Sequence, residues 1–106
     1  MMHSSGSPGT VVLVVEFTAR PDTVEELRER LLVLTGLTRA EAGCVRYDLH
    51  THPQDPLRLS FVEEWDTPDA LAEHDRTPWV RDIREHLPRL VGPDGVRRTE
   101  LRHLEP

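Results

Sequence analysis

The chain has 106 residues, 37% hydrophobic but only 5% aromatic, so we expect one domain with a core built mainly from valine and leucine. Its net charge of −6 argues against a nucleic-acid partner, because such binding needs a concentrated basic surface. The single Cys44 excludes an internal disulfide and a paired-cysteine metal site, and no apolar run approaches the roughly 20 residues of a membrane span.

Residues 1–10 contain neither the charged nor the apolar region of a signal peptide, and we predict a disordered leader there. Residues 11–104 are then the single folded domain of a soluble, cytoplasmic protein. Within it, residues 11–18, VVLVVEFT, form a β-branched run that is typical of a buried strand. Both faces of this strand are largely apolar, so we expect other parts of the protein to cover each face.

A helix is predicted over about residues 22–40. Thr23 and Glu26 have the spacing of a capping box at its start, and leucines recur at helical spacing behind them. Gly43 is a favoured residue for the C-terminal end of a helix. The segment is therefore expected to form an amphipathic helix that packs on the sheet.

The next strand is predicted over residues 44–52. Because side chains alternate along a strand, Tyr47 should point toward the helices. Cys44, His50 and His52 should point to the opposite face. Two prolines in the following turn end this strand.

The strand predicted over residues 57–66 places a carboxylate within an otherwise apolar row, because Glu63 and Trp65 share a face with leucine and phenylalanine. A helix follows, with an N-cap residue and a proline at Thr67-Pro68. Its apolar side carries His74. An acid, an imidazole and an indole are therefore expected together at one end of the sheet.

A second Thr-Pro pair, Thr77-Pro78, divides the helical region into a short and a longer piece. Trp79 lies on the apolar side of the longer piece, and Pro88 is expected to end it. A turn at residues 92–95 precedes a last, charge-rich strand over about residues 96–103. The order β-α-β-β-α-β predicts an α+β, ferredoxin-like fold with a four-stranded antiparallel sheet and the helices on one face.

Helices on one face leave the other face of this sheet uncovered. Val12, Val14 and Val62 would lie there among charged side chains such as Arg46 and Glu64. A partly apolar open surface of this kind favours association. We therefore expect a homodimer in which two sheets pack face to face.

Several short segments follow one another in an order shared with a known family. They are VVLVVEF, Pro21-Asp22, Glu41-Ala42-Gly43-Cys44 before Tyr47, Glu63-Glu64-Trp65, and Ala70-Leu71 with His74 shortly before Thr77-Pro78. From about Val11 to about Ile83 the chain resembles the antibiotic biosynthesis monooxygenase domain family, which belongs to the dimeric α/β-barrel group. The resemblance implies a homodimer that acts on a small molecule. The family also includes haem-degrading enzymes and isomerases, and fold alone does not choose among these activities.

Haem degradation is the branch that the sequence disfavours. The haem-degrading members use an Asn on the first strand and a His late in the second helical region. The corresponding positions here are Val14 or Val15 and about Arg84, and the chain contains no Asn. His86 is nearby but lies on a different side of the helix. Haem is therefore not expected, and because the sequence also contains no flavin or metal motif, we predict no organic cofactor and no metal.

His74 and Glu63 are the predicted catalytic residues. An imidazole can take or give a proton near neutral pH. Burial would raise the pKa of Glu63 unless a partner compensates, so Glu63 could orient His74 or act as the base itself. The alternatives are structural: His74 as an edge-of-core residue bonded to backbone or to Glu63, and Glu63 paired with an arginine.

Trp65, Tyr47 and Trp79 are the predicted substrate-binding residues, with ordinary core packing as the alternative for each. His50 and His52 share a strand face and could chelate a metal. Solvation at the turn is the simpler interpretation, and no metal site is predicted there.

The resemblance favours a cofactor-independent monooxygenase that oxidises a small phenolic or quinol-like substrate with dioxygen. An electron-rich phenol can reduce dioxygen once a base has made it an anion, so the protein need supply only a pocket, an orientation and a proton acceptor. Two alternatives stay open. One is a cofactor-free isomerase of a small hydroxyketone, and the other is a non-catalytic, dimeric ligand-binding module.

Overall fold

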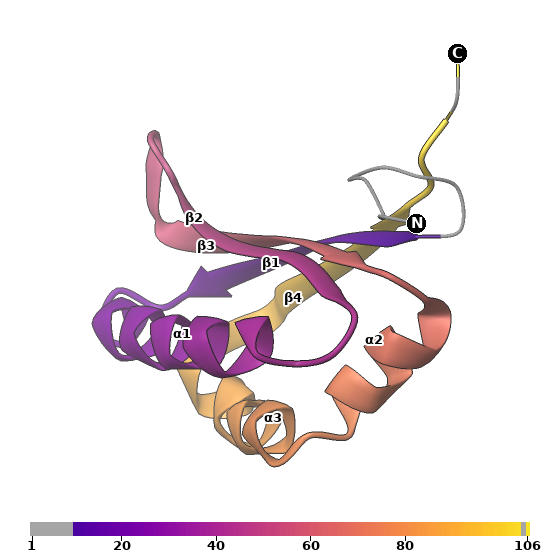
Figure 1. Ribbon diagram of the computed structural model, residues 1–106. Helices are drawn as coiled ribbons and strands as arrows, with labels where there is room; N and C mark the ends of the chain where they lie inside the picture. Colours follow the sequence, from indigo (N-terminus) through magenta and orange to yellow (C-terminus); the bar gives the residue numbers. More distant parts are fainter. Residues whose placement is uncertain (1–9, 105) are drawn as a thin grey trace.

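The computed structural model describes residues 10–104 and residue 106, so the predicted leader lies outside the described residues except for Thr10, which is buried. The described part forms four strands and three helices in the order β-α-β-β-α-α-β (Figure 1). Their bounds are β1 Val11–Ala19, α1 Val24–Arg39, β2 Cys44–His52, β3 Asp55–Trp65, α2 Pro68–Asp75, α3 Pro78–Leu90 and β4 Val91–Leu101.

The strands form one antiparallel sheet in the order β2-β3-β1-β4. All three described helices lie on the same side of it (Figure 1). The predicted ferredoxin-like fold is therefore confirmed, with its second helical region divided at Thr77 as expected.

The core lies between this sheet and the helices. Leu27, Leu31 and Leu34 are buried along one side of α1, and Leu59 and Phe61 are buried on the facing side of β3. Each such side chain contributes roughly 1.5–3 kcal/mol when it is fully buried. The apolar residues that recur at helical spacing in α1 and at strand spacing in β3 therefore pack together in one layer.

The opposite face of the sheet is covered by none of the described helices (Figure 1). Val12, Val14 and Val62 are only partly buried there, and Val14 pairs directly with Val62. This face has the composition that the sequence predicts.

The start of α1 differs from the predicted capping box. The side chain of Thr23 makes no capping hydrogen bond. Its hydroxyl instead donates to the Leu90 carbonyl at 2.6 Å, and Glu26 pairs with arginines rather than with the backbone. The helix also ends at Arg39, before Gly43. Contacts with the end of α3 outweigh the local capping pattern.

The predicted end of α3 and the predicted start of β4 were also wrong. Pro88 lies inside α3, which continues to Leu90, because a proline in the last turn removes only one intrahelical hydrogen bond. β4 begins at Val91, which pairs with Ala19, and Val96 pairs with Phe17. Residues 92–95 lie between these two pairs and loop out of the strand. The predicted turn is therefore a bulge within β4.

A bulge at the start of β2 reverses the predicted direction of Cys44. Cys44 pairs with Trp65 while Arg46 pairs with Glu64, so Val45 is an extra residue and is exposed. Cys44 consequently packs against the core, and burial raises the pKa of its thiol to about 11. The alternation rule failed here because one inserted residue exchanges the two faces.

In the part of the chain that the structure describes, no helix combines the length and hydrophobicity needed to cross a membrane.

Candidate functional site

A cavity of about 160 Å³ lies between the sheet and helices α2 and α3. A volume near 150 Å³ holds a benzene ring. Most of the wall is apolar, and the polar lining residues are Glu63, His74, Asp75, Arg84 and Arg98. The apolar lining residues are Val15, Phe17, Leu34, Tyr47, Phe61, Val80, Ile83, Leu87 and Val96.

His74 is held in this wall by aromatic packing. Its ring centroid lies 4.6 Å from that of Trp65 and 5.5 Å from that of Tyr47. Only 4% of the residue is exposed. These contacts fix the plane of the imidazole from two strands at once.

Glu41 fixes the rotation of the same ring. His74 Nδ1 donates to Glu41 Oε2 at 2.9 Å, and Trp79 Nε1 donates to the same oxygen at 2.8 Å. A carboxylate can only accept, so in neutral His74 the proton is on Nδ1 and Nε2 is the nitrogen that can take a proton. The arrangement is that of a general base with an orienting carboxylate.

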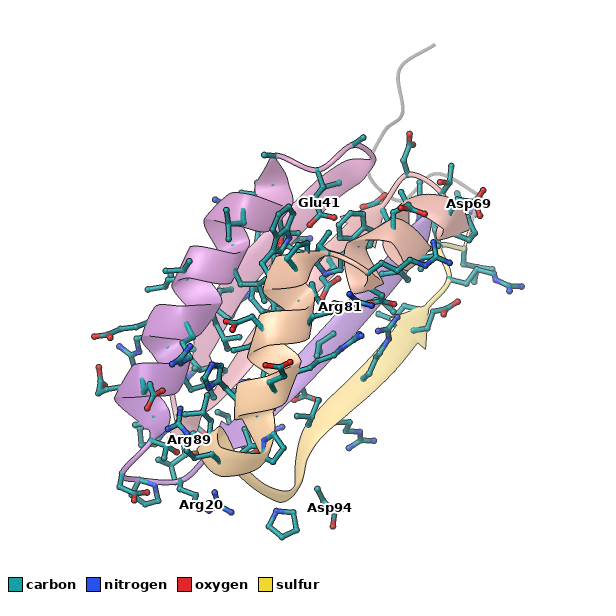
Figure 2. The ribbon with its side chains drawn as sticks, turned by 90° about the horizontal axis from the view of Figure 1, so that it is seen from below. Arg20, Glu41, Asp69, Arg81, Arg89 and Asp94 are labelled. Carbon is teal, nitrogen blue, oxygen red and sulfur yellow. The ribbon has the colours of Figure 1, made fainter. Side chains whose placement is uncertain are left out.

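A tight loop brings Glu41 to His74. Figure 2 shows Glu41 where the C-terminal end of α1, the start of α3 and α2 approach one another. Gly43 has a φ of +82°, and its carbonyl accepts from the Asp66 N–H at 2.7 Å. A Cβ at Gly43 would lie 2.5 Å from the Ala70 Cβ, which is shorter than side chains tolerate. Glycine therefore permits the close approach of α2, the helix that carries His74.

Glu63 is almost fully buried in the same wall, with 4% exposure. Trp65 Nε1 donates to Glu63 Oε1 at 2.9 Å. Burial raises the pKa of Glu63 above its usual 4.5, although the Trp65 hydrogen bond and the charge of His74 oppose the shift. Glu63 thus retains a proton at higher pH than an exposed glutamate.

Tyr47 is also buried, and burial followed by the charge of Glu63 raises its pKa well above the usual 10. Its phenol therefore stays neutral near pH 7 and can act as a hydrogen-bond donor but not as a base.

The structure brings three of the five predicted site residues together in the cavity: Tyr47, Glu63 and His74. Trp65 is fully buried and supports His74 and Glu63 from behind rather than lining the cavity. Trp79 lies outside it, along grooves on the helical surface, and donates a hydrogen bond to Glu41, the partner of His74.

The two histidines of β2 have separate local partners. His50 Nδ1 lies 3.1 Å from the Asp48 carbonyl, and His52 Nε2 lies 2.8 Å from the Ser60 hydroxyl. Among residues 10–104 and 106, no group of three or more His, Cys, Asp or Glu side chains is arranged to hold a metal.

Sequence reasoning gave Glu41 no role, although it belongs to the Glu41-Ala42-Gly43-Cys44 segment of the family pattern. It lies 33 residues from His74 along the chain. Arg84 and Arg98, which line the cavity and are about half exposed, were likewise given no part in the site. The sequence signal was the place of Glu41 in that segment, two residues before Gly43.

Residues 10–86 match the model of the family described as Antibiotic biosynthesis monooxygenase. The match covers Glu41, Tyr47, Glu63 and His74 but ends before β4. The Mycobacterium tuberculosis protein named "Putative monooxygenase Rv0793" is 33% identical over 81 residues, which cover 76% of this chain and 79% of that protein.

Solved structures give the same result. The structure of Rv0793 from Mycobacterium tuberculosis has a TM-score of 0.85 and 31% identity, covering 92% of this chain and 97% of that chain. PA3566 from Pseudomonas aeruginosa has a TM-score of 0.86 and 29% identity, covering 96% of this chain and 100% of that chain. The similarity therefore extends over nearly the whole length of both chains.

Proposed function

This chain belongs to the antibiotic biosynthesis monooxygenase family, and from that premise we propose that it is a cytoplasmic, cofactor-independent monooxygenase of a small phenolic substrate. The observation that carries the proposal is His74, which is buried in the wall of a ring-sized cavity with its Nδ1 bonded to Glu41. An imidazole in that position can accept the proton of a phenol.

The proposed reaction draws its electrons from the substrate. His74 Nε2 removes the phenol proton, and the phenolate reduces dioxygen. One oxygen atom of dioxygen forms a bond to a ring carbon, and the C–H bond of that carbon breaks. The other oxygen atom leaves as water, which contains the hydrogen of the broken C–H bond and the hydrogen of the phenol O–H group. Phenol and dioxygen thus become quinone and water, with no external reductant.

Glu63 has a separate role in this proposal. Its raised pKa favours the protonated form of the carboxyl group beside the cavity, so this group can supply a proton. That proton can go to the oxygen atom that departs as water. Glu63 then regains its proton from the imidazolium of His74 through substrate or water, and both residues return to their starting states.

The size of the cavity limits the substrate. About 160 Å³ accommodates one aromatic ring but not a polycyclic polyketide. We therefore expect a single-ring phenol or quinol.

Oxygen uptake with a panel of single-ring phenols tests the function. The purified protein, with no metal or flavin added, should consume one dioxygen per quinone formed. With ¹⁸O₂, each quinone should contain one labelled oxygen. Absence of uptake, or formation of hydrogen peroxide in place of labelled quinone, would contradict the proposal.

We further propose that the protein is a homodimer joined through the open face of the sheet. The support is the partly buried set of Val12, Val14 and Val62 on that face. A stable interface of this kind buries about 2,000 Å² or more. Light scattering should give the dimer mass at micromolar concentration, and a monomer would contradict the proposal.

An isomerase is the second candidate, because a base at His74 and a carboxyl group of raised pKa at Glu63 could move a proton within a hydroxyketone without oxygen. Turnover of a small hydroxyketone under argon would favour it over the monooxygenase. Binding of phenols without any turnover would instead favour a non-catalytic ligand-binding module.

A further inference from the structure

Two guanidinium groups share one carboxylate among the residues that line the cavity. Arg84 Nη2 lies 3.0 Å from Asp75 Oδ1, and Arg98 Nη1 lies 3.7 Å from the same oxygen. The three residues come from α2, α3 and β4, and all three line the cavity. Within this cluster of three residues, one negative charge stands against two positive charges. The charge of Arg98 also acts on Glu63 and favours its ionised form, although burial raises the pKa of that carboxyl group.

This positive charge contrasts with the protein as a whole, whose net charge is −6. The side chains of Arg84 and Arg98 are 51% and 43% exposed, so an incoming anion meets them at the surface and not in the core. A guanidinium presents several N–H donors in a fork that matches the two oxygens of a carboxylate.

The interior of the cavity has the opposite character. Glu63 is buried in its wall, so a carboxylate placed inside would lose its water beside another carboxyl group. Aromatic and aliphatic side chains such as Tyr47, Phe61 and Val80 line the remainder. A substrate with one phenol and one carboxylate therefore has a single favourable orientation, with the ring inside and the carboxylate at the arginines.

We propose that Arg84 and Arg98 form a carboxylate subsite, so that the preferred substrates are single-ring phenols that bear a carboxylate away from the reacting hydroxyl. The inference rests on the proposed function in so far as it uses the same cavity. It adds the chemical class of the substrate, which the two arginines select. The subsite includes Arg98, which lies beyond the residues matched by the family model.

Equilibrium binding measured under argon tests the subsite without turnover. The probes are 3-hydroxybenzoate and 3-hydroxybenzamide, which share shape and differ in charge. The wild-type protein should bind the acid about 10-fold more tightly than the amide, as expected for hydrogen bonds to a charged group. This preference should weaken as salt is added, because the arginines are half exposed.

Arg98→Gln should reduce the preference for the acid to less than about 3-fold and leave amide binding unchanged. Arg97→Gln is the matched control: the residue is adjacent on β4, has the same charge, and pairs with Glu16, so it points to the open face of the sheet and away from the cavity. Because that face is the proposed dimer interface, light scattering should show that the variant keeps the mass of the wild type. This variant should keep the wild-type preference.

Asp75→Asn should tighten binding of the acid by about 3-fold or more, because it removes the carboxylate that competes for both arginines. A subsite that was only a structural ion pair would not gain affinity in this way. Equal binding of the two probes by the wild type, binding of neither probe, or an unchanged preference in Arg98→Gln would overturn the proposal.

The outcome is independent of the monooxygenase proposal. Preference for the acid without oxygen uptake supports the subsite and rejects the oxygenase. Oxygen uptake at equal rates with acid and amide, together with equal binding, rejects the subsite and leaves the oxygenase.

Discussion

Glutamate side chains at the two ends of the helical layer lie in opposite environments, and their pKa values shift in opposite directions. Figure 2 shows Glu41 at one end, with Arg20 and Arg89 at the other. At the Arg89 end, Glu26 accepts two hydrogen bonds from Arg89, at 2.8 and 2.6 Å, and one from Arg30 at 2.8 Å. These hydrogen bonds lower the pKa of Glu26 to about 2.

At the Glu41 end, polar groups are buried and each has few partners. Glu63 has a raised pKa because burial outweighs its hydrogen bond from Trp65. His74 has one carboxylate partner and two aromatic neighbours. Glu26 is partly exposed, and its hydrogen bonds with Arg89 join α1 to α3. Glu63 is buried, and burial raises the pKa of its carboxyl group. Burial with incomplete compensation is typical of functional sites, and it supports the proposal that the chemistry takes place at this end of the molecule.

The largest effect should come from His74→Gln at the buried end. Loss of the proton acceptor should lower turnover of a phenolic substrate by roughly 10²- to 10⁴-fold. The amide keeps a polar group near Glu41, so most of the protein should remain folded. Oxygen uptake and urea unfolding, measured on the same samples, separate catalysis from stability.

His86→Gln is the control for that prediction, because His86 lies on the outer side of α3, in contact with Asp82 and Arg89. It should retain wild-type turnover. If the activity of His74→Gln merely followed its folded fraction, His74 would be a structural residue and the two ends would not differ in function.

Gly43→Ala should destabilise the fold by about 2–4 kcal/mol, because it combines a positive φ with an overpacked contact to Ala70. Gly36→Ala is the matched control within α1, where a Cβ would meet nothing within 4 Å. It should stabilise the protein by about 0.5–1 kcal/mol. Urea unfolding of both variants checks the opposite signs, and equal effects would show that the Gly43 loop is not under this constraint.

Glu41→Gln should lower kcat by about 10- to 100-fold, because the imidazole loses the carboxylate that sets its orientation. KM should change little, since Glu41 lines the outer groove and not the cavity. Glu73→Gln, on the rim of the same groove, should leave both constants unchanged. A change in KM alone would mean that Glu41 affects binding rather than proton transfer.

The smallest effects are pH dependences of stability, and they should have opposite signs at the two ends. The raised pKa of Glu63 means that the folded state holds its proton more tightly, so its contribution falls as pH rises from about 4.5 through the raised value. The contribution of Glu26 is present above about 4.5 and is lost as pH falls toward 2.

Urea unfolding of Glu63→Gln and Glu26→Gln over a range of pH checks these signs. The first variant should lack the decline on the alkaline side, and the second should lack the decline on the acid side. High salt should reduce the difference between wild type and Glu26→Gln, because that ion pair is exposed. If the contributions of Glu63 and Glu26 to the free energy of unfolding changed with pH in the same direction, the predicted contrast between the two ends would be wrong.

The regular elements could be predicted from the sequence because their signals are local. Leucines at helical spacing predicted α1, and the two Thr-Pro pairs predicted the starts of α2 and α3, where the Thr67 and Thr77 side chains do cap the helices. Alternation along β3 placed Glu63 and Trp65 on the buried face. The open sheet face followed from the order of the elements.

Tertiary contacts decided the remainder. Glu41 meets His74 because Gly43 lets α2 approach, and Arg84 meets Arg98 because α3 and β4 lie on either side of Asp75. The bulge that turns Cys44 inward depends on how β2 pairs with β3. Periodicity records which face of an element is apolar, but a hydrogen bond between residues far apart in the chain depends on the register and spacing of whole elements. The sequence by itself therefore determined the layers of this protein, whereas packing between the layers decided which polar groups share the cavity.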